Sequence, residues 1–146
     1  MGTEWAQPLR ILFCGSRDYD DPRPIDACLA DIFREHPDAE IINGGAPGAD
    51  TIAAMHALKQ GFHVETYMAD WDTYGRGAGP IRNKQMLDSG LDFVYAFVNK
   101  PRLEDSRGTA NMVGIAREAG VETLVINTYI ERRIEERNNA RKGTPW

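Results

Sequence analysis

Residues 40–61 read EIINGGAPGADTIAAMHALKQG and predict a strand, a glycine-rich loop and a helix in succession. The apolar run Glu40–Asn43 has the length and composition of a buried strand. A glycine-rich loop, Gly44–Asp50, follows it. The alanine-rich segment Asp50–Gln60 carries larger apolar residues at helical spacing, and Gly61 ends it. A strand that runs through a loop into a helix is the repeating unit of parallel α/β sheets.

The same alternation extends along the whole chain. Four further runs, rich in Ile, Val, Phe and Tyr, predict buried parallel strands: Leu9–Cys14, Phe62–Met68, Leu91–Val98 and Glu122–Asn127. Amphipathic spacing and terminal Pro or Gly residues predict three more helices: Ile25–Phe33 closed by Pro37, Pro80 to about Ser89, and Thr109–Ala116 ended by Gly120. This order predicts an α/β fold with a five-stranded parallel sheet, right-handed crossovers and helices on both faces. The loop after the first strand is expected to face the ligand crevice, so this strand should be central.

The length of 146 residues fits one domain. We predict a core over residues 9–127 and a charged, helical C-terminal tail over residues 128–146. In the tail, Arg132 and Glu136 have the i,i+4 spacing of a helical ion pair. Three roles stay open for this tail: a helix packed on the body, an arm of a homodimer or higher homo-oligomer, or a solvated helix.

The composition excludes several classes of protein. A hydrophobic content of 42% is enough for a core, so a disordered chain is excluded. The longest apolar run is the six residues Phe93–Val98, whereas a spanning helix needs about 20, so we expect no membrane partner. Residues Met1–Trp5 have neither the basic start nor the apolar stretch of a signal peptide. These features predict a cytoplasmic protein.

The cysteines, histidines and charges narrow the function further. Cys14 and Cys28 lie in apolar stretches without a CxxC motif, and the three histidines lack HExxH spacing, so we expect no metal and assign no cofactor. The net charge is −5; the tail carries five bases and three acids, which leaves −7 for the remainder. Because nucleic-acid binding needs a basic face, the acidic body argues against a nucleic-acid partner.

Long polar loops follow the predicted strands, whereas the returns from helix to strand are short, as at Gly61, Gly90 and Gly120. Ligands of open parallel sheets bind beyond the carboxyl ends of the strands, where the strand order reverses. This asymmetry therefore predicts a ligand site at the carboxyl edge of the sheet. The loops mix basic and acidic residues, which suits a ligand that carries both phosphates and hydroxyls.

The loop after the first strand reads Gly15-Ser16-Arg17. The glycine lets the backbone approach a ligand closely, and the next two residues offer a hydroxyl and a guanidinium. The alternative is an ordinary turn with a surface arginine.

The second loop contains Gly44, Gly45 and Gly48 before a helix start, and free N–H groups there would form an anion site. At least one of these glycines should adopt a positive φ. The loop is neither a Walker A motif nor a GxGxxG fingerprint. Asp50 either accepts hydrogen bonds from ribose or only caps the helix while the glycines make a tight turn.

The loop before the third helix holds Asp70, Trp71, Arg82 and Asn83. The Trp71 ring can stack on a base. Arg82 lies in the first turn of a predicted helix, where the helix dipole disfavours a cation, which indicates an anionic partner. The alternative for Arg82 is a salt bridge to Asp70 or Asp72.

The fourth loop enters its helix through Ser106, Gly108 and Thr109, which predict a second phosphate cradle. The alternative is a plain N-cap at Ser106 or Thr109. We assign no catalytic residue.

These loops together resemble the SLOG superfamily, and more narrowly its small stand-alone members related to YpsA. The resemblance covers about residues 9–127 and rests on four motifs in order: Gly15-Ser16-Arg17; Gly-Gly-Ala-x-Gly-Ala-Asp at 44–50; Asp70-Trp71 with 78–83; and Gly108-Thr109. It implies a Rossmann-like sheet of order 3-2-1-4-5. It also implies a sensor or binding module for a nucleotide or nucleotide-derived ligand, of the ADP-ribose, NAD-like or cyclic-nucleotide type.

Distant relatives in this superfamily are the cytokinin-activating phosphoribohydrolases, which makes a nucleotide N-glycosidase the alternative function. Their arginine before the third helix matches Arg82, and their Gly-Thr matches Gly108-Thr109. Their catalytic Glu position falls on Met112, and Ser106 replaces their first Gly. A methionine cannot transfer a proton or stabilise a developing cation, so the resemblance favours binding over hydrolysis.

Overall fold

The computed structural model describes residues 7–142 of the chain. The expectations for Met1–Trp5 and for the last four residues of the tail lie outside this range. The elements along the chain are β1 (Arg10–Gly15), α1 (Pro22–Glu35), β2 (Glu40–Asn43), α2 (Ala49–Gln60), β3 (His63–Thr66), α3 (Trp71–Tyr74), η2 (Gly75–Gly77), α4 (Ala78–Asp88), β4 (Phe93–Val98), η3 (Leu103–Asp105), α5 (Arg107–Glu118), β5 (Glu122–Asn127) and α6 (Tyr129–Lys142).

The five strands form one parallel sheet in the order β3-β2-β1-β4-β5, which confirms the predicted fold class and strand order. β1 is central: Leu12 lies opposite Ile42 of β2 and opposite Val94 of β4. The strand order reverses at β1, so the loops after β1 and β4 diverge and open a crevice between them.

Helices cover both faces of the sheet and bury two apolar clusters. On one face, α1 and α2 pack through residues such as Ile25, Leu29 and Ala53 against Phe13 and Phe97 of the central strands. On the other face, α4 and α5 enclose the second cluster: Leu12, Cys14, Ile42, Met86, Val94, Ala96, Met112, Val113 and Ala116. Alternate residues of β1 and β4 enter opposite clusters, so residues 11–14 of β1 and all of β4 are apolar, as in buried parallel strands.

Several boundaries differ from the predictions. The loop after β3 contains the short helix α3, because Asp70 is its N-cap and accepts a hydrogen bond from Thr73 N at 3.1 Å. Helix α4 begins at Ala78 rather than at Pro80; a proline fits the first turn because N–H groups there have no intrahelical partner. Arg82 is therefore the fifth residue of α4, and the prediction that it lies in the first turn is wrong. Gly61 ends α2 in the left-handed conformation, as predicted.

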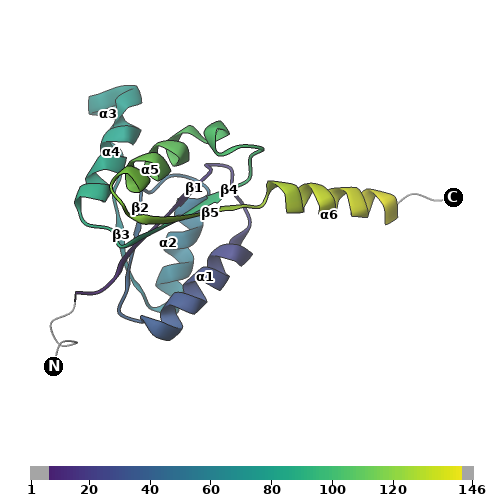
Figure 1. Cartoon of the computed structure of the whole chain (residues 1–146), viewed down its shortest axis with the longest axis horizontal. Coiled ribbons are helices and arrows are strands. Elements are labelled where there is room, and N and C mark those ends of the chain that lie inside the picture. The colour runs from purple at the N-terminus through teal and green to yellow at the C-terminus, as the bar shows by residue number, and fades with distance from the viewer. Residues whose placement is uncertain (1–6, 143–146) are drawn as a thin grey trace.

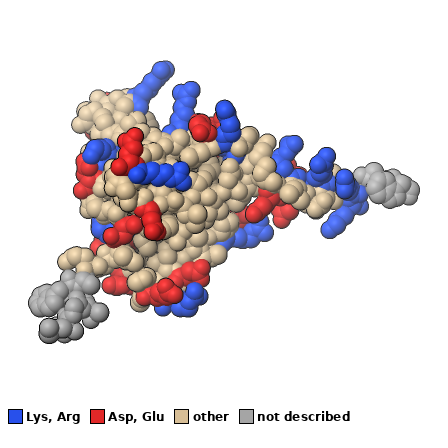
Figure 2. Space-filling model, viewed as in Figure 1, with Lys and Arg blue, Asp and Glu red and all other residues tan. Residues whose placement is uncertain are grey.

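Helix α6 extends away from the body (Figure 1) and has no buried residue. Figure 2 shows acidic and basic side chains interspersed over the visible face of the body, with basic side chains gathered along the projecting α6. Between residues 7 and 142, no helix has the length and apolar character to cross a membrane.

Candidate functional site

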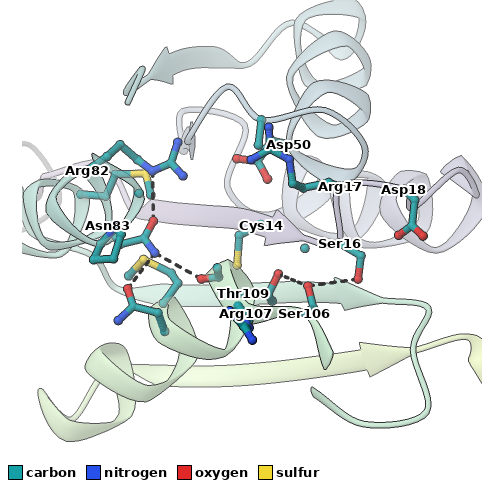
Figure 3. Close-up of a pocket in the computed structure, with 18 of the residues that line it drawn as sticks. Cys14, Ser16, Arg17, Asp18, Asp50, Arg82, Asn83, Ser106, Arg107 and Thr109 are labelled. Carbon is teal, nitrogen blue, oxygen red and sulfur yellow. Dashed lines mark hydrogen bonds between the residues drawn. The ribbon is translucent and has the colours of Figure 1, made fainter. Parts of the chain in front are cut away.

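A cavity of about 680 Å³ lies at the carboxyl edge of the sheet, between the loops that follow β1 and β4. Figure 3 shows side chains from these loops and from α4 and α5 converging on it. Its wall comprises Cys14, Gly15, Ser16, Arg17, Asp18, Ala46, Asp50, Trp71, Arg76, Gly79, Pro80, Arg82, Asn83, Met86, Lys100, Asp105, Ser106, Arg107, Gly108, Thr109, Asn111 and Met112. The cavity occupies the place where a parallel sheet of this order binds ligands.

The β1 loop forms one wall. A Cβ on Gly15 would overlap the Phe97 carbonyl and lie 2.7 Å from the Ala49 Cβ, so only glycine fits at this strand end. Ser16 is buried, and its N–H donates to Phe97 O at 2.9 Å, which fixes the loop against β4. Arg17 is exposed, with its guanidinium carbon 6.0 Å from the centre of the Trp71 ring. The two sides of the cavity mouth thus meet in a cation–π contact.

Three hydroxyls connect the two loops. Ser16 Oγ donates to Ser106 Oγ at 3.3 Å, and Ser106 Oγ lies 2.8 Å from Thr109 Oγ1 (Figure 3). Ser106 occupies the N-cap position of α5, but its side chain makes no capping hydrogen bond. The predicted alternative of a plain side-chain cap is therefore wrong for Ser106.

The N-terminus of α5 faces the cavity with unused donors. Its first intrahelical bond runs from Ala110 N to Ser106 O, so the preceding amides of Arg107, Gly108 and Thr109 have no i−4 partner. All three of these residues line the cavity. Amide dipoles and the positive end of the helix make this a favourable place for an anion.

Arg82 of α4 is held by backbone oxygens. Its Nη1 donates to the carbonyls of Gly44 and Tyr67, and its Nε donates to Asn83 Oδ1 at 3.0 Å. Within residues 7–142, no carboxylate forms a salt bridge with it, so the expected alternative of an ion pair with Asp70 or Asp72 is wrong. Burial lowers the Arg82 pKa from its ordinary value; the Asp50 charge opposes this, and the nearby Arg17 charge adds to it. An arginine stays protonated in either case, so this charge is available to a ligand.

Asp50 is buried and acts neither as the N-cap of α2 nor as an exposed acceptor. Gly48 is the N-cap, and Asp50 Oδ2 accepts from Gly44 N at 2.7 Å across the loop. Burial raises the pKa of this carboxyl to about 6, although the Gly44 N–H and the Arg82 charge oppose the rise. The Asp50 side chain therefore joins the two ends of the glycine-rich loop by a buried hydrogen bond.

The glycine-rich loop confirms one prediction and contradicts another. Gly45 and Gly48 have positive φ values of 68° and 82°. The N–H groups of Gly44 and Gly45, however, do not face the cavity as free donors, because they are bonded to Asp50 Oδ2 and Asn43 Oδ1. The glycines serve close packing instead: a Cβ on Gly44 would lie 2.5 Å from Arg82 Nη1, and one on Gly48 would lie 2.6 Å from Arg17 O.

Asn83 joins the two helices that border the cavity. Its Nδ2 donates to Gly108 O at 3.2 Å and to Asn111 Oδ1 at 2.9 Å, while its Oδ1 accepts from Arg82. Because Asn83 is buried, this network fixes the start of α5 relative to Arg82.

Of the fourteen residues predicted as ligand-binding, the structure brings ten to the cavity wall: Gly15, Ser16, Arg17, Asp50, Trp71, Arg82, Asn83, Ser106, Gly108 and Thr109. Four do not line it: Gly44, Gly45, Gly48 and Asp70. The first three lie in the loop behind Arg82, and Asp70 caps α3.

Sequence reasoning missed other lining residues. Asn111 and Met112 follow Gly108 by three and four positions, so helical spacing alone could have placed them on the same face. Lys100 and Asp18 form an ion pair of 2.6 Å between the β1 and β4 loops, which no local pattern reveals. Arg76 and Arg107 add two exposed cations to the wall.

Cys14 at the cavity wall is a buried thiol. Burial raises its pKa well above the ordinary value, and the Asp50 charge adds to that effect, so it stays protonated. Residues 7–142 contain no group of three or more side chains able to hold a metal ion.

Comparisons with known proteins place this geometry in a family. The model of the YspA, cpYpsA-related SLOG family matches residues 9–74. The Gene 61 protein of Mycobacterium phage D29 is 36% identical in an alignment of 121 residues, with 79% of this chain and 94% of that protein covered.

Two solved structures are similar to this chain at a lower level. DNA processing protein A (DprA) from Streptococcus pneumoniae has a TM-score of 0.47 and 16% identity, with 80% of this chain and 58% of that chain covered. The NADH-dependent reductase A1-R' complexed with NAD has a TM-score of 0.44 and 13% identity, with 83% and 59% covered. This chain thus spans less than two thirds of either structure. On the match of its sequence to the family and to the phage relative, the chain belongs to the YspA, cpYpsA-related SLOG family.

Proposed function

We propose that the chain binds a nucleotide or nucleotide-derived small molecule, of the ADP-ribose, NAD-like or cyclic-nucleotide type, in the cavity at the carboxyl edge of the sheet. Its role would be that of a sensor or binding module. The observation that carries this proposal is the convergence of several guanidinium groups with the open N-terminus of α5 on one cavity.

The charges around the cavity support an anionic ligand. Arg17, Arg82 and Arg107 line it, and among the residues described none of the three forms a salt bridge. The carboxylates nearby are engaged elsewhere: Asp18 pairs with Lys100, and Asp50 accepts from Gly44 N. A phosphate would supply the missing counter-charge and accept bidentate hydrogen bonds from a guanidinium.

The remaining chemistry supports a nucleotide over a bare anion. Ser16 donates its hydroxyl proton to Ser106, so one O–H of the Ser106–Thr109 pair remains free to donate to a phosphate or sugar oxygen, and the hydroxyl oxygens can accept from a sugar. Trp71 at the mouth is 49% exposed and presents a ring for stacking. A volume of about 680 Å³ lies within the usual range of small-molecule sites and exceeds what inorganic phosphate would fill.

Hydrolysis is not part of the proposal. The position of the phosphoribohydrolase glutamate is held by Met112, which is buried and lines the cavity without a titratable group. Asp50, the buried carboxyl at this site, is bonded to the glycine-rich loop. Chromatography after incubation with nucleotides tests this directly, and release of free base would overturn the proposal of a pure binding module.

Isothermal titration with ADP-ribose, NAD, cyclic AMP and adenosine tests the proposal. At least one of the phosphate-bearing compounds should bind, and adenosine should bind much more weakly. Arg82→Ala should weaken the binding by roughly 10- to 150-fold, the range of a charged hydrogen bond. Arg117→Ala, at an exposed position near the end of α5, is the matched control and should leave affinity unchanged. Failure of all three phosphate compounds to bind, or equal binding of adenosine, would reject the proposal.

A further inference from the structure

On the sheet face that α1 and α2 cover, the part over β4 and β5 next to α1 is left uncovered by the described part of the chain. Leu124 of β5 lies opposite Tyr95 of β4 and shares its side of the sheet, and Leu124 is 48% exposed. Phe93 and Tyr95 are only partly buried on this side. A groove of about 310 Å³ continues the uncovered face along α1, lined by Leu9, Ile11, Asp31, Ile32, Glu35, His36, Asp92, Phe93 and Tyr95.

Helix α6 carries an exposed apolar stripe. Ile130 and Ile134, one helical turn apart, are 63% and 54% exposed. The helix projects from the body (Figure 1), and the ion pair of Arg132 with Asp20 at 2.9 Å ties its first turn to the body. Its 14 residues span about 21 Å, close to the length of a six-residue strand.

The link between β5 and α6 prevents the helix from folding back over its own strand. Thr128 is the single residue between them. It is buried, and its N–H donates to Val98 O at 2.9 Å. The first helical bond of α6 follows at once, from Arg132 N to Thr128 O. Reversal from a strand to a covering helix usually takes two to six residues, and links too short for this reversal favour exchange between copies.

The charges of the two surfaces are complementary. The distal half of α6 carries Arg137, Arg141 and Lys142. The groove is rimmed by the acidic residues Asp31, Glu35 and Asp92, near the amino ends of the strands. A helix lying antiparallel to β5 would bring its basic distal end to this acidic rim and its two isoleucines to Leu124.

We propose that α6 is exchanged between two copies of this chain, the helix of each covering the open β4–β5 face of the other. The interface is reciprocal, as twofold symmetry requires. Because α6 leaves from the carboxyl edge of the sheet, this exchange turns the cavity-bearing edges of the two copies toward each other. The proposal rests on the packing of α6 and not on the identity of any ligand.

Sedimentation velocity on the full chain tests the exchange. The wild type should have twice the chain mass of 16.3 kDa. Ile130→Asp with Ile134→Asp removes the donor stripe and should give monomers, as should Leu124→Asp on the acceptor face. Leu58→Asp changes a leucine that is 62% exposed on α2, outside both surfaces, and should remain dimeric. Because all these side chains are exposed, circular dichroism should show folded variants.

Mixing the donor and acceptor variants distinguishes the exchange of α6 from a dimer in which two α6 helices pair with each other. A donor variant retains its acceptor face, and an acceptor variant retains its α6, so an equimolar mixture of the two should form heterodimers by restoring one of the two contacts. A monomeric wild type would overturn the proposal, as would a dimeric donor variant. A mixture that stays monomeric would also overturn it. In that case an intact α6 would not bind an intact β4–β5 face of another copy, so the two would not act as separate donor and acceptor surfaces.

Discussion

Replacing Asp50 by asparagine should change how the stability of the protein depends on pH. Asp50 is 4% exposed, and burial raises its pKa from 3.8 to about 6. The native state therefore binds a proton more tightly than the unfolded chain. The stability from this group is fully present below about pH 4 and is lost as the pH rises through about 6.

The size of the effect follows from the pKa rise. At about 1.4 kcal/mol per pH unit, the rise corresponds to about 3 kcal/mol of native-state stability lost between about pH 4 and pH 7. The asparagine of the variant would not titrate, and its side-chain oxygen can still accept from Gly44 N, as Asp50 Oδ2 does at 2.7 Å. The free energy of unfolding of Asp50→Asn, minus that of the wild type, should therefore increase by about 3 kcal/mol over this pH range.

Urea unfolding of both proteins at several pH values measures this difference. Groups with lowered pKa, such as Asp18 and Asp21, shift both curves alike and cancel in the subtraction. Glu65→Gln is the control, because its difference from the wild type should change with pH in the opposite direction. Hydrogen bonds from Tyr67 and Arg10 lower the Glu65 pKa, so this variant should lose stability relative to the wild type as the pH rises. Parallel profiles for Asp50→Asn and the wild type would refute a titrating, buried Asp50.

Two further substitutions test the packing behind the site, each by urea unfolding. Gly48→Ala should destabilise the fold by more than about 2 kcal/mol, because φ is 82° and the added Cβ would lie 2.6 Å from Arg17 O. Its control, Gly114→Ala in open space on α5, should be neutral or slightly stabilising, and equal effects of the two variants would contradict the steric argument. Asn83→Ala should cost about 2–3 kcal/mol, since it leaves Gly108 O and Arg82 Nε without their partner, and a loss below about 0.5 kcal/mol would show that the network does not stabilise the protein.

The sheet could be predicted because its signals are local. Each strand is a short apolar run, and Pro or Gly punctuates the helices at positions such as Pro37, Gly61 and Gly120. Strand Glu122–Asn127 was predicted with its observed bounds, whereas Phe62–Met68 shortened to His63–Thr66, since an edge strand pairs only where its single neighbour β2 extends. The order of the strands came from the family resemblance and not from the pattern.

The sequence predicted which loops form the site but not the hydrogen bonds that link their residues. Loop length and glycine content indicated which loops meet, and Arg82 was singled out because a cation is disfavoured in the first turn of a helix. Contacts between distant residues were beyond reach: Asp50 turns back to Gly44, and Arg82 reaches the same residue across 38 positions. Nothing in the sequence of the glycine-rich loop shows that its amides are satisfied internally.

Those two contacts define what the glycine-rich loop does. The N–H of Gly44 is held by Asp50 at the start of α2, and its carbonyl is held by Arg82, the fifth residue of α4. One residue thus joins two helices, and any side chain on it would collide with the guanidinium. The loop supports the site by fixing the position of a cation, while the open amides are those of α5 on the opposite wall. Under the proposed function, a bound phosphate would lie between Arg82 and α5. The loops on the two sides of β1 would then contribute different chemistry to the same ligand.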